Sequence, residues 1–179
     1  NFFLFDTLNF FKNKNKKILH ISTFDERNNH RLFNISLSNK ISKGMIHNNH
    51  DIINFSYRNH LGKLNRKNTT NTNSKIWEIC NNYKPDLVIL GHNNVLDINT
   101  LEKIKNNVKS KVILWYEDAL SKKGQGPSWR SNLNLIQNNS NLIDTYFTTT
   151  HPDNISDTNI KKSKLFFLPM LVDENIENL

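Results

Sequence analysis

The sequence has only one cysteine, Cys80, among its 179 residues. A single thiol excludes an internal disulfide bond and a zinc site built from several cysteines. No apolar run approaches the roughly 18–20 residues that a membrane-spanning helix requires. We therefore expect a cytoplasmic protein. Because the chain does not begin with methionine, we interpret it as a fragment of a longer protein.

Three motifs of nucleotide-binding and hydrolytic enzymes are also missing from the sequence. No G-x-G-x-x-G follows the first predicted strand, so a dinucleotide would lack the glycines that usually surround its pyrophosphate. No G-x-x-x-x-G-K-S/T occurs, which argues against a P-loop nucleotide hydrolase. No G-x-S-x-G occurs, so an α/β-hydrolase would lack its nucleophile elbow.

Positive charge is in excess, with 24 Lys and Arg against 16 Asp and Glu and a formal net charge of +8. Such an excess is one signature of nucleic-acid binding. Here the lysines are scattered, and Lys, Asn and Ile, which A/T-rich codons encode, are all abundant. The clusters at 14–17 and 161–162 stand at the edges of predicted elements, where solvated charges are common. We therefore expect no specific nucleic-acid partner and keep a basic nucleic-acid-binding domain as the lesser alternative.

Short apolar runs alternate with stretches of helical spacing from Lys17 onward. The run at 86–91 is apolar nearly throughout, as in parallel strands that are covered on both faces. The alternation predicts a doubly wound, mostly parallel, Rossmann-like α/β sheet of about six strands with helices on both faces. The predicted strands are 18–22, 51–56, 86–91, 111–116, 144–149 and 164–168, and the predicted helices are 31–46, a segment around 76–80, 96–108 and 128–137.

Residues 1–16 form a separate N-terminal segment rich in Phe and Lys. A membrane-surface anchor has this composition, and so does an element that packs on the edge of a domain. The apolar-then-basic order is the reverse of a secretory signal. We favour packing and keep peripheral membrane contact through 1–17 open.

Polar and ionisable residues follow nearly every predicted strand. In open α/β sheets, ligands bind beyond the carboxyl ends of the strands, where the strand order reverses. Arg27 and Arg31 flank the start of the first helix, whose amino terminus favours anions, although a solvated helix surface would look the same. The candidate substrate-binding residues are Thr23, Arg27, Arg31, Tyr57, Arg58, Gly91, Asn93, Tyr116, Glu117 and His151.

Two of these strand ends carry groups suited to acid–base chemistry and sugar recognition. In Gly91-His92-Asn93 the glycine permits a close backbone approach, and the histidine can act as a general base near neutral pH. A histidine that caps the next helix is an equal alternative. Trp115-Tyr116-Glu117-Asp118 supplies aromatic rings and carboxylates, which stack on sugar rings and hydrogen-bond hydroxyls, and one of the two aromatics is expected in the core.

His47 and His50 have the spacing of a metal-binding pair. They bracket the turn at the amino end of the second predicted strand, away from the expected site. A metal site needs at least a third ligand nearby. We therefore expect no metal.

Several segments, in order and spacing, resemble the N-terminal domain of GT-B glycosyltransferases, closest to the spore-maturation (CgeB-like) branch. Each motif is weak alone, and together they cover nearly the whole chain. The segments are Lys17–Ser22, the long helix before His50-Asp51-Ile52, Tyr57-Arg58, Tyr83–His92, Trp115–Asp118, and Phe167-Leu168-Pro169 followed by Val172-Asp173.

The resemblance implies two Rossmann-like domains that face a cleft, with no cofactor and no obligatory metal. A nucleotide-sugar donor would bind mainly to the C-terminal domain and the acceptor mainly to the N-terminal one. Residues 17–173 would form the acceptor-side domain, and 174–179 would begin a linker to a missing C-terminal donor-binding domain. The implied reaction moves a sugar from the donor to a hydroxyl of a glycan or other acceptor, and the chain alone would be inactive.

By position, the resemblance implies His92 or Asp118, with Asp25 third, as the base that deprotonates the acceptor hydroxyl. The loop after the first strand departs from the GT-B pattern. It carries Phe24-Asp25-Glu26-Arg27 in place of a glycine-rich turn. The resemblance therefore does not support a contact between this loop and the donor phosphates. The main alternative is a non-catalytic nucleotide- or glycan-binding module of the same fold.

Overall fold

The computed structural model describes residues 15–24, 36–57, 69–91, 95–122 and 128–171. These residues form one sheet of six parallel strands in the order β2-β1-β3-β4-β5-β6. The predicted fold class is confirmed, and each predicted strand lies within two residues of its observed bounds. The strands are β1 (Lys17–Ser22), β2 (Asp51–Ser56), β3 (Leu87–Gly91), β4 (Lys111–Tyr116), β5 (Thr145–Thr148) and β6 (Leu165–Phe167).

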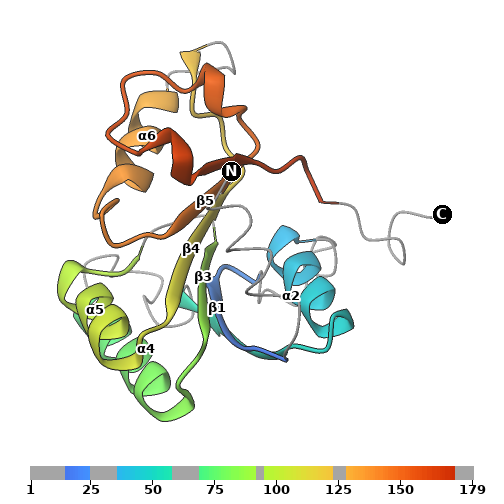
Figure 1. Ribbon diagram of the computed structural model, residues 1–179, viewed down its shortest axis with the longest axis vertical. Coiled ribbons are helices and arrows are strands. Elements are labelled where there is room, and N and C mark those ends of the chain that lie inside the picture. The colour runs from blue at the N-terminus through green and yellow to red at the C-terminus, as the bar shows by residue number, and fades with distance from the viewer. Residues whose placement is uncertain (1–14, 25–35, 58–68, 92–94, 123–127, 172–179) are drawn as a thin grey trace.

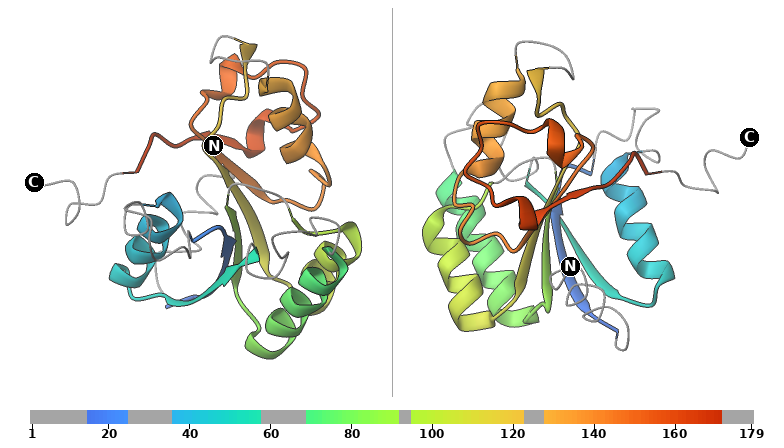
Figure 2. Two further views of the ribbon diagram at one scale, coloured as in Figure 1. Left: turned by 180° about the vertical axis from the view of Figure 1, so that it is seen from behind. Right: turned by 45° about the horizontal axis from the view of Figure 1, so that its top comes forward.

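Helices cover both faces of this sheet. Helix α2 (Leu37–His47) lies on one face, and α4 (Thr69–Tyr83) and α5 (Ile98–Lys103) lie on the other (Figures 1 and 2). The chain runs from β1 outward to β2 and then back across β1 to β3. Because such crossovers are right-handed, a reversal of direction moves the connecting helix to the opposite face.

The two faces differ in the chemistry of their cores. The larger core joins the sheet to α4, α5 and α6 (Trp129–Gln137) through apolar side chains such as Ile76, Leu101 and Ile136. The smaller apolar core lies under α2 and contains Ile18, Leu87, Ile89 and Ile113. Polar side chains are buried beside it, namely His20, Ser22, Ser38 and Ser42.

Local capping decides where the predicted helices begin. Ser36 Oγ accepts the backbone N–H of Asn39 at 3.3 Å, so the described part of the first predicted helix starts at Leu37. Three predicted segments lie outside the described residues, namely 31–35 of this helix, 1–14 of the N-terminal segment and 172–179. Asp97 caps α5 through the N–H of Thr100, and the helix continues as a π-turn over Ile104–Val108.

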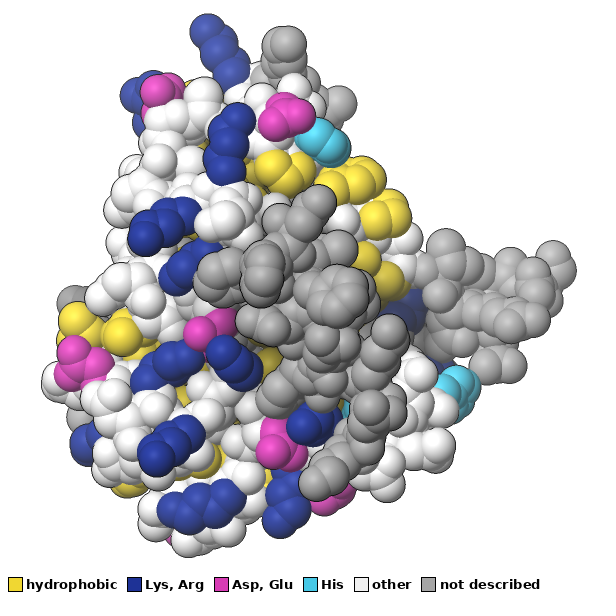
Figure 3. Space-filling model, viewed as in Figure 1, with side chains coloured by type: hydrophobic (Ala, Val, Ile, Leu, Met, Phe, Trp, Pro, Cys, Tyr) yellow, Lys and Arg dark blue, Asp and Glu magenta, His cyan; other side chains and the backbone are white. Residues whose placement is uncertain are grey.

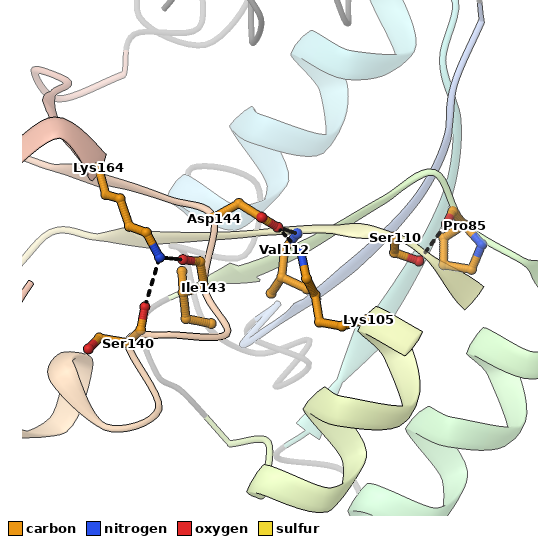
Figure 4. Close-up of polar contacts among 8 residues, drawn as sticks. All are labelled: Pro85, Lys105, Ser110, Val112, Ser140, Ile143, Asp144 and Lys164. Carbon is orange, nitrogen blue, oxygen red and sulfur yellow. Dashed lines mark hydrogen bonds and ion pairs between the residues drawn. The ribbon is translucent and has the colours of Figure 1, made fainter. Parts of the chain in front are cut away.

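Side-chain hydrogen bonds connect the loops at the amino end of the sheet (Figure 4). Asp144 Oδ2 accepts from the backbone N–H of Val112 at 2.7 Å and from Lys105 Nζ at 2.5 Å. Lys164 Nζ donates to the carbonyls of Ser140 and Ile143, which follow α6. These contacts give the side chains of Asp144, Lys105 and Lys164 structural roles at the amino end of the sheet.

Two surface properties bear on the choice of partner. No helix within the described ranges is long and apolar enough to cross a membrane. On the face drawn in Figure 3, Lys and Arg side chains are spread out, with acidic side chains between them. This distribution matches the scattered lysines of the sequence.

Removal of the Asp144 carboxylate should destabilise the protein. In Asp144→Ala the buried N–H of Val112 loses its side-chain acceptor, and an unpaired buried donor costs about 1–3 kcal/mol. We expect that decrease in the free energy of unfolding, measured by urea denaturation. Asp157→Asn, at an exposed turn with φ of 56°, should stay within about 0.5 kcal/mol of the wild type. Equal stability of the two variants would contradict the assignment.

Candidate functional site

The strand order reverses between β1 and β3. From β1 the sheet grows to β2 on one side, and from β3 it grows through β4 to β6 on the other. The helices that follow β1 and β3 along the chain, α2 and α5, lie on opposite faces of the sheet. A crevice at the carboxyl ends of such strands is the usual ligand site of an open α/β sheet. Ser22 and Gly91 are the last residues of these two strands.

The structure brings several predicted site residues to this edge. Thr23 directly follows β1, Tyr57 follows β2, and Gly91 ends β3. Tyr116 ends β4, and Glu117 and Asp118 come next. Since β2, β1, β3 and β4 are adjacent, these residues lie along one continuous edge of the sheet. The remaining predicted residues Asp25, Arg27, Arg31, Arg58, His92 and Asn93 lie outside the described residues.

Tyr116 and Asp118 form the best-defined pair at this edge. Tyr116 is 2% exposed and its hydroxyl donates to the exposed carboxylate of Asp118. Burial and the neighbouring Asp118 carboxylate raise the pKa of Tyr116, with smaller contributions from Glu117 and Tyr57. The tyrosine therefore stays protonated and holds one side of the carboxylate, while the rest of Asp118 faces solvent.

The segment that carries Asp118 is fastened to its neighbours. Thr149 Oγ1 donates to the carbonyl of Glu117 at 2.6 Å. Thr150 Oγ1 accepts from the N–H of Leu120, and Asn132 of α6 donates to the carbonyl of Ala119. Hydrogen bonds from neighbouring segments thus fix the position of the segment that carries this carboxylate. A catalytic or binding group requires such support.

His151 lies apart from the other candidates. It follows β5, two strands beyond β3, and its exposed ring accepts from the N–H of Asp153. The Asp153 carboxylate also lies 3.6 Å from His151 Nδ1. The ring contacts Phe167 of β6, with centroids 5.6 Å apart. The structure therefore places His151 in a local cluster and does not bring it to the crevice between β1 and β3.

Sequence reasoning missed a polar network on the α2 side of the same crevice. His20 Nδ1 lies 2.9 Å from Ser42 Oγ, and Ser42 Oγ donates to Asn54 Oδ1 at 2.8 Å. Ser22 Oγ lies 2.6 Å from Ser38 Oγ, one turn earlier in α2. The network therefore connects β1 with α2 and β2.

A sequence signal for this network existed. His20 and Ser22 are polar residues two apart in an otherwise apolar strand, so they face the same side of the sheet. Ser38 and Ser42 are four apart in the following helix and therefore share one helix face. Matching polar pairs on a strand and on its covering helix predict a buried hydrogen-bonded seam.

Gly91 is explained by packing within this seam. A Cβ at this position would lie 2.4 Å from Ser22 Oγ and 3.2 Å from His20 Nε2. Ser22 Oγ also donates to the carbonyl of Gly91 at 3.3 Å. The glycine thus makes room for the side chains of β1, whereas the sequence suggested room for a ligand.

Asn73 of α4 is a second residue that sequence reasoning missed. It is 3% exposed, its Oδ1 accepts from the N–H of Asp97, and its Nδ2 donates to the carbonyl of Val95. A single amide thereby holds the described segment after β3 against α4. No local sequence motif predicts such a residue, because its hydrogen-bond partners are 22 and 24 positions away.

The described residues contain no group of three or more His, Cys, Asp and Glu that could hold a metal ion. His50 Nδ1 accepts from the backbone N–H of Lys16 at 3.3 Å, and His47 is the exposed last residue of α2. The two histidines lie at the amino end of β2, as the sequence predicted.

Two solved structures resemble this chain at low sequence identity. One is UDP-GlcNAc 2-epimerase from Methanocaldococcus jannaschii, with a TM-score of 0.53 and 17% identity over 84% of the chain. The other is MnaA from S. aureus in complex with UDP, with a TM-score of 0.52 and 14% identity over 90%. No protein-family model matches the sequence, and no curated protein matches it.

The chain spans about half the length of these two proteins, 45% and 48% respectively. At such identities the likeness establishes the fold alone. The described sheet, with its single reversal of strand order, is therefore a Rossmann-like α/β unit.

Gly91→Ala should destabilise the protein, because the added methyl group collides with Ser22 Oγ. Overpacking of this kind typically costs about 1–3 kcal/mol. Gly44→Ala is the matched control, since a Cβ at Gly44 in helix α2 meets nothing within 4 Å. There alanine should stabilise by about 0.5–1 kcal/mol. Urea denaturation of both variants measures these opposite shifts, and a stabilised Gly91→Ala would contradict the packing argument.

The buried imidazole of His20 should make stability depend on pH. Burial lowers the pKa of His20 from 6.5 to about 3, so between these values the unfolded chain binds a proton that the folded chain does not. This contribution to stability is complete above pH 6.5 and is lost as the pH falls toward 3. The free energy of unfolding should then decrease by up to about 1.4 kcal/mol per pH unit.

Urea titrations between pH 4 and pH 7 test this dependence. The variant His20→Asn should have a smaller slope of unfolding free energy against pH than the wild type. His47→Asn, at the exposed end of α2, is the control. An unchanged slope in His20→Asn would show that the imidazole is not held uncharged by burial.

Proposed function

We propose that this chain is the acceptor-side half of a GT-B enzyme that transfers a sugar from a nucleotide sugar to a hydroxyl group. The observation that carries the proposal is the reversal of strand order between β1 and β3, with the Tyr116–Asp118 pair at the same edge. The crevice has the position of a ligand site. The pair supplies an accessible and anchored carboxylate there.

The proposed chemistry needs a base at the acceptor hydroxyl. The acceptor oxygen bonds to the anomeric carbon of the donor sugar, the bond from that carbon to the diphosphate oxygen breaks, and the hydroxyl proton passes to the base. Asp118 can accept this proton because its carboxylate is exposed and only partly engaged by Tyr116. A base must reach its proton at hydrogen-bond distance. His92 and Asp25 remain the other candidate bases.

The structural neighbours support a uridine nucleotide sugar as the donor. One of them is named for UDP-GlcNAc and the other was solved with UDP. In our proposal residues 17–173 hold the acceptor, and a second domain beyond the linker that starts at 174–179 holds the donor. After β6 the chain runs back toward α2, where Lys40 Nζ donates to the carbonyl of Leu171. A domain attached there would stand beside the crevice.

Asp118→Asn tests the proposed base in a protein that carries both domains. General-base catalysis contributes about 10²–10⁴-fold, so kcat for sugar transfer should fall by at least about 10²-fold. The Kd for UDP should stay within about twofold, a change worth under 1 kcal/mol. Asp157→Asn, an exposed carboxylate away from the crevice, should leave both quantities unchanged.

Near-normal turnover in Asp118→Asn would remove Asp118 as the base. A wild-type protein that binds UDP and sugars but transfers none would favour a non-catalytic binding module.

A further inference from the structure

His20 has a buried nitrogen without a hydrogen-bond partner. The residue is 0% exposed, and its Nε2 has no hydrogen-bond partner among the residues that the structure describes. A buried polar atom left unpaired costs about 1–3 kcal/mol, and such atoms in a native protein call for an explanation. This one lies in β1, beside the point where the strand order reverses.

The network around His20 determines which hydrogen bond is missing. Ser42 has one hydroxyl hydrogen and donates it to Asn54 Oδ1. The bond between Ser42 Oγ and His20 Nδ1 must therefore be donated by the imidazole. With its proton on Nδ1, the uncharged ring presents a lone pair on Nε2. The missing partner is consequently a hydrogen-bond donor.

Other polar atoms that lack a partner among the described residues lie on the same face of the sheet as His20. Paired residues of parallel strands point to one face, so the register places Ser56, Ser22, Gly91 and Trp115 in one row on the α2 side of the sheet. Trp115 is 2% exposed, and its Nε1–H donor is also buried without a partner, as is Ser56 Oγ. The row thus holds an unused donor and an unused hydroxyl on the same face of the sheet as the unused acceptor of His20.

These groups select the chemistry of a ligand. A hydroxyl group can donate to His20 Nε2, whereas a phosphate oxygen is an acceptor and would meet the Nε2 lone pair. Burial also lowers the pKa of His20 to about 3, so the ring brings no positive charge to attract an anion. The preferred ligand is therefore neutral and rich in hydroxyls.

We propose that His20 is a specificity residue of the crevice, whose Nε2 accepts a hydrogen bond from a hydroxyl of a neutral sugar. The proposal deepens the function above, on which it rests, because it assigns the α2 side of the crevice to the acceptor. Asp118 lies on the other side, toward α4, with Tyr57 and Tyr116. Ser42 and Asn54 act through His20 as positioning residues, since they hold its proton on Nδ1.

In this proposal, Phe24 moves when a ligand reaches His20. The Phe24 ring lies edge-on against the imidazole, with centroids 5.0 Å apart and an interplanar angle of 80°. It is 7% exposed and directly follows Thr23 beyond β1. A ligand hydroxyl reaches Nε2 when this ring turns away, so sugar binding should be coupled to a change at Phe24.

NMR of the ¹⁵N-labelled full chain at pH 7 tests the proposal directly. Before ligand is added, His20 should show a protonated Nδ1 and an unprotonated Nε2. Glucose and N-acetylglucosamine are the neutral probes, and UDP is the anionic comparison. Either sugar should shift the Nε2 resonance and the Phe24 ring signals, whereas UDP should leave Nε2 unchanged. Ser42→Ala should move part of the population to the Nε2–H form and weaken the response.

Two substitutions separate the role of Nε2 from a structural role. In His20→Asn the shorter amide can still donate to Ser42 but leaves nothing at the Nε2 position. Its Kd for the responding sugar should rise about tenfold, which corresponds to 1.4 kcal/mol. His20→Gln places an amide near the Nε2 position and should recover part of the affinity. Circular dichroism confirms that both variants are folded.

The outcomes distinguish this proposal from the proposed function. An Nε2 resonance that responds to neither sugar, or an unchanged sugar Kd in His20→Asn, overturns the assignment of His20 even if sugar transfer is observed. A clear Nε2 response in a two-domain protein that transfers no sugar leaves the hydroxyl site standing and removes the enzymatic role. A response to UDP alone overturns the selection of neutral ligands.

Discussion

The pairing of β1 with both β2 and β3 is the constraint on which the rest of this structure depends. It makes β1 an interior strand, so its side chains are buried on both faces. It also forces the chain to reverse direction across the sheet, which sends α2 to one face and α4 and α5 to the other. The carboxyl ends of β1 and β3 therefore form the switch point at which open α/β sheets usually bind their ligands.

The two sides of that crevice have different chemistry because different helices cover them. Toward α4 lie the rings of Tyr57 and Tyr116 and the carboxylate of Asp118, which faces solvent. Toward α2 lies the seam of His20 and the serines, uncharged and closed to solvent. An accessible carboxylate suits proton transfer, and an uncharged seam with unused donors and acceptors suits recognition of hydroxyl groups. Both are features on which our proposal of a neutral acceptor rests.

Much of the fold was predictable because its signals are local. Apolar runs bounded by Lys-Pro or Gly mark strands such as β3, and helical spacing marks α4 and α6. The predicted helix ends were less accurate where a capping residue decides them, as Asp97 does for α5. For the candidate site, the strand ends located Thr23, Gly91 and Asp118 along the sheet edge, and their roles there stay predictions. His151 was placed with them because strand ends alone do not reveal how many strands separate two loops.

The sequence by itself determined the alternation of strands and helices, the parallel class of the sheet and the candidate residues at its carboxyl edge. These follow from hydrophobic period and run length, which are properties of neighbouring residues. Only the tertiary structure decided that β1 lies between β2 and β3, that Gly91 makes room for Ser22, and that Ser42 directs the proton of His20. Each of these depends on contacts between distant segments, such as Ser22 and Gly91, which are 69 positions apart. Local pattern carries no information on such contacts, because they are selected by the packing of the whole sheet.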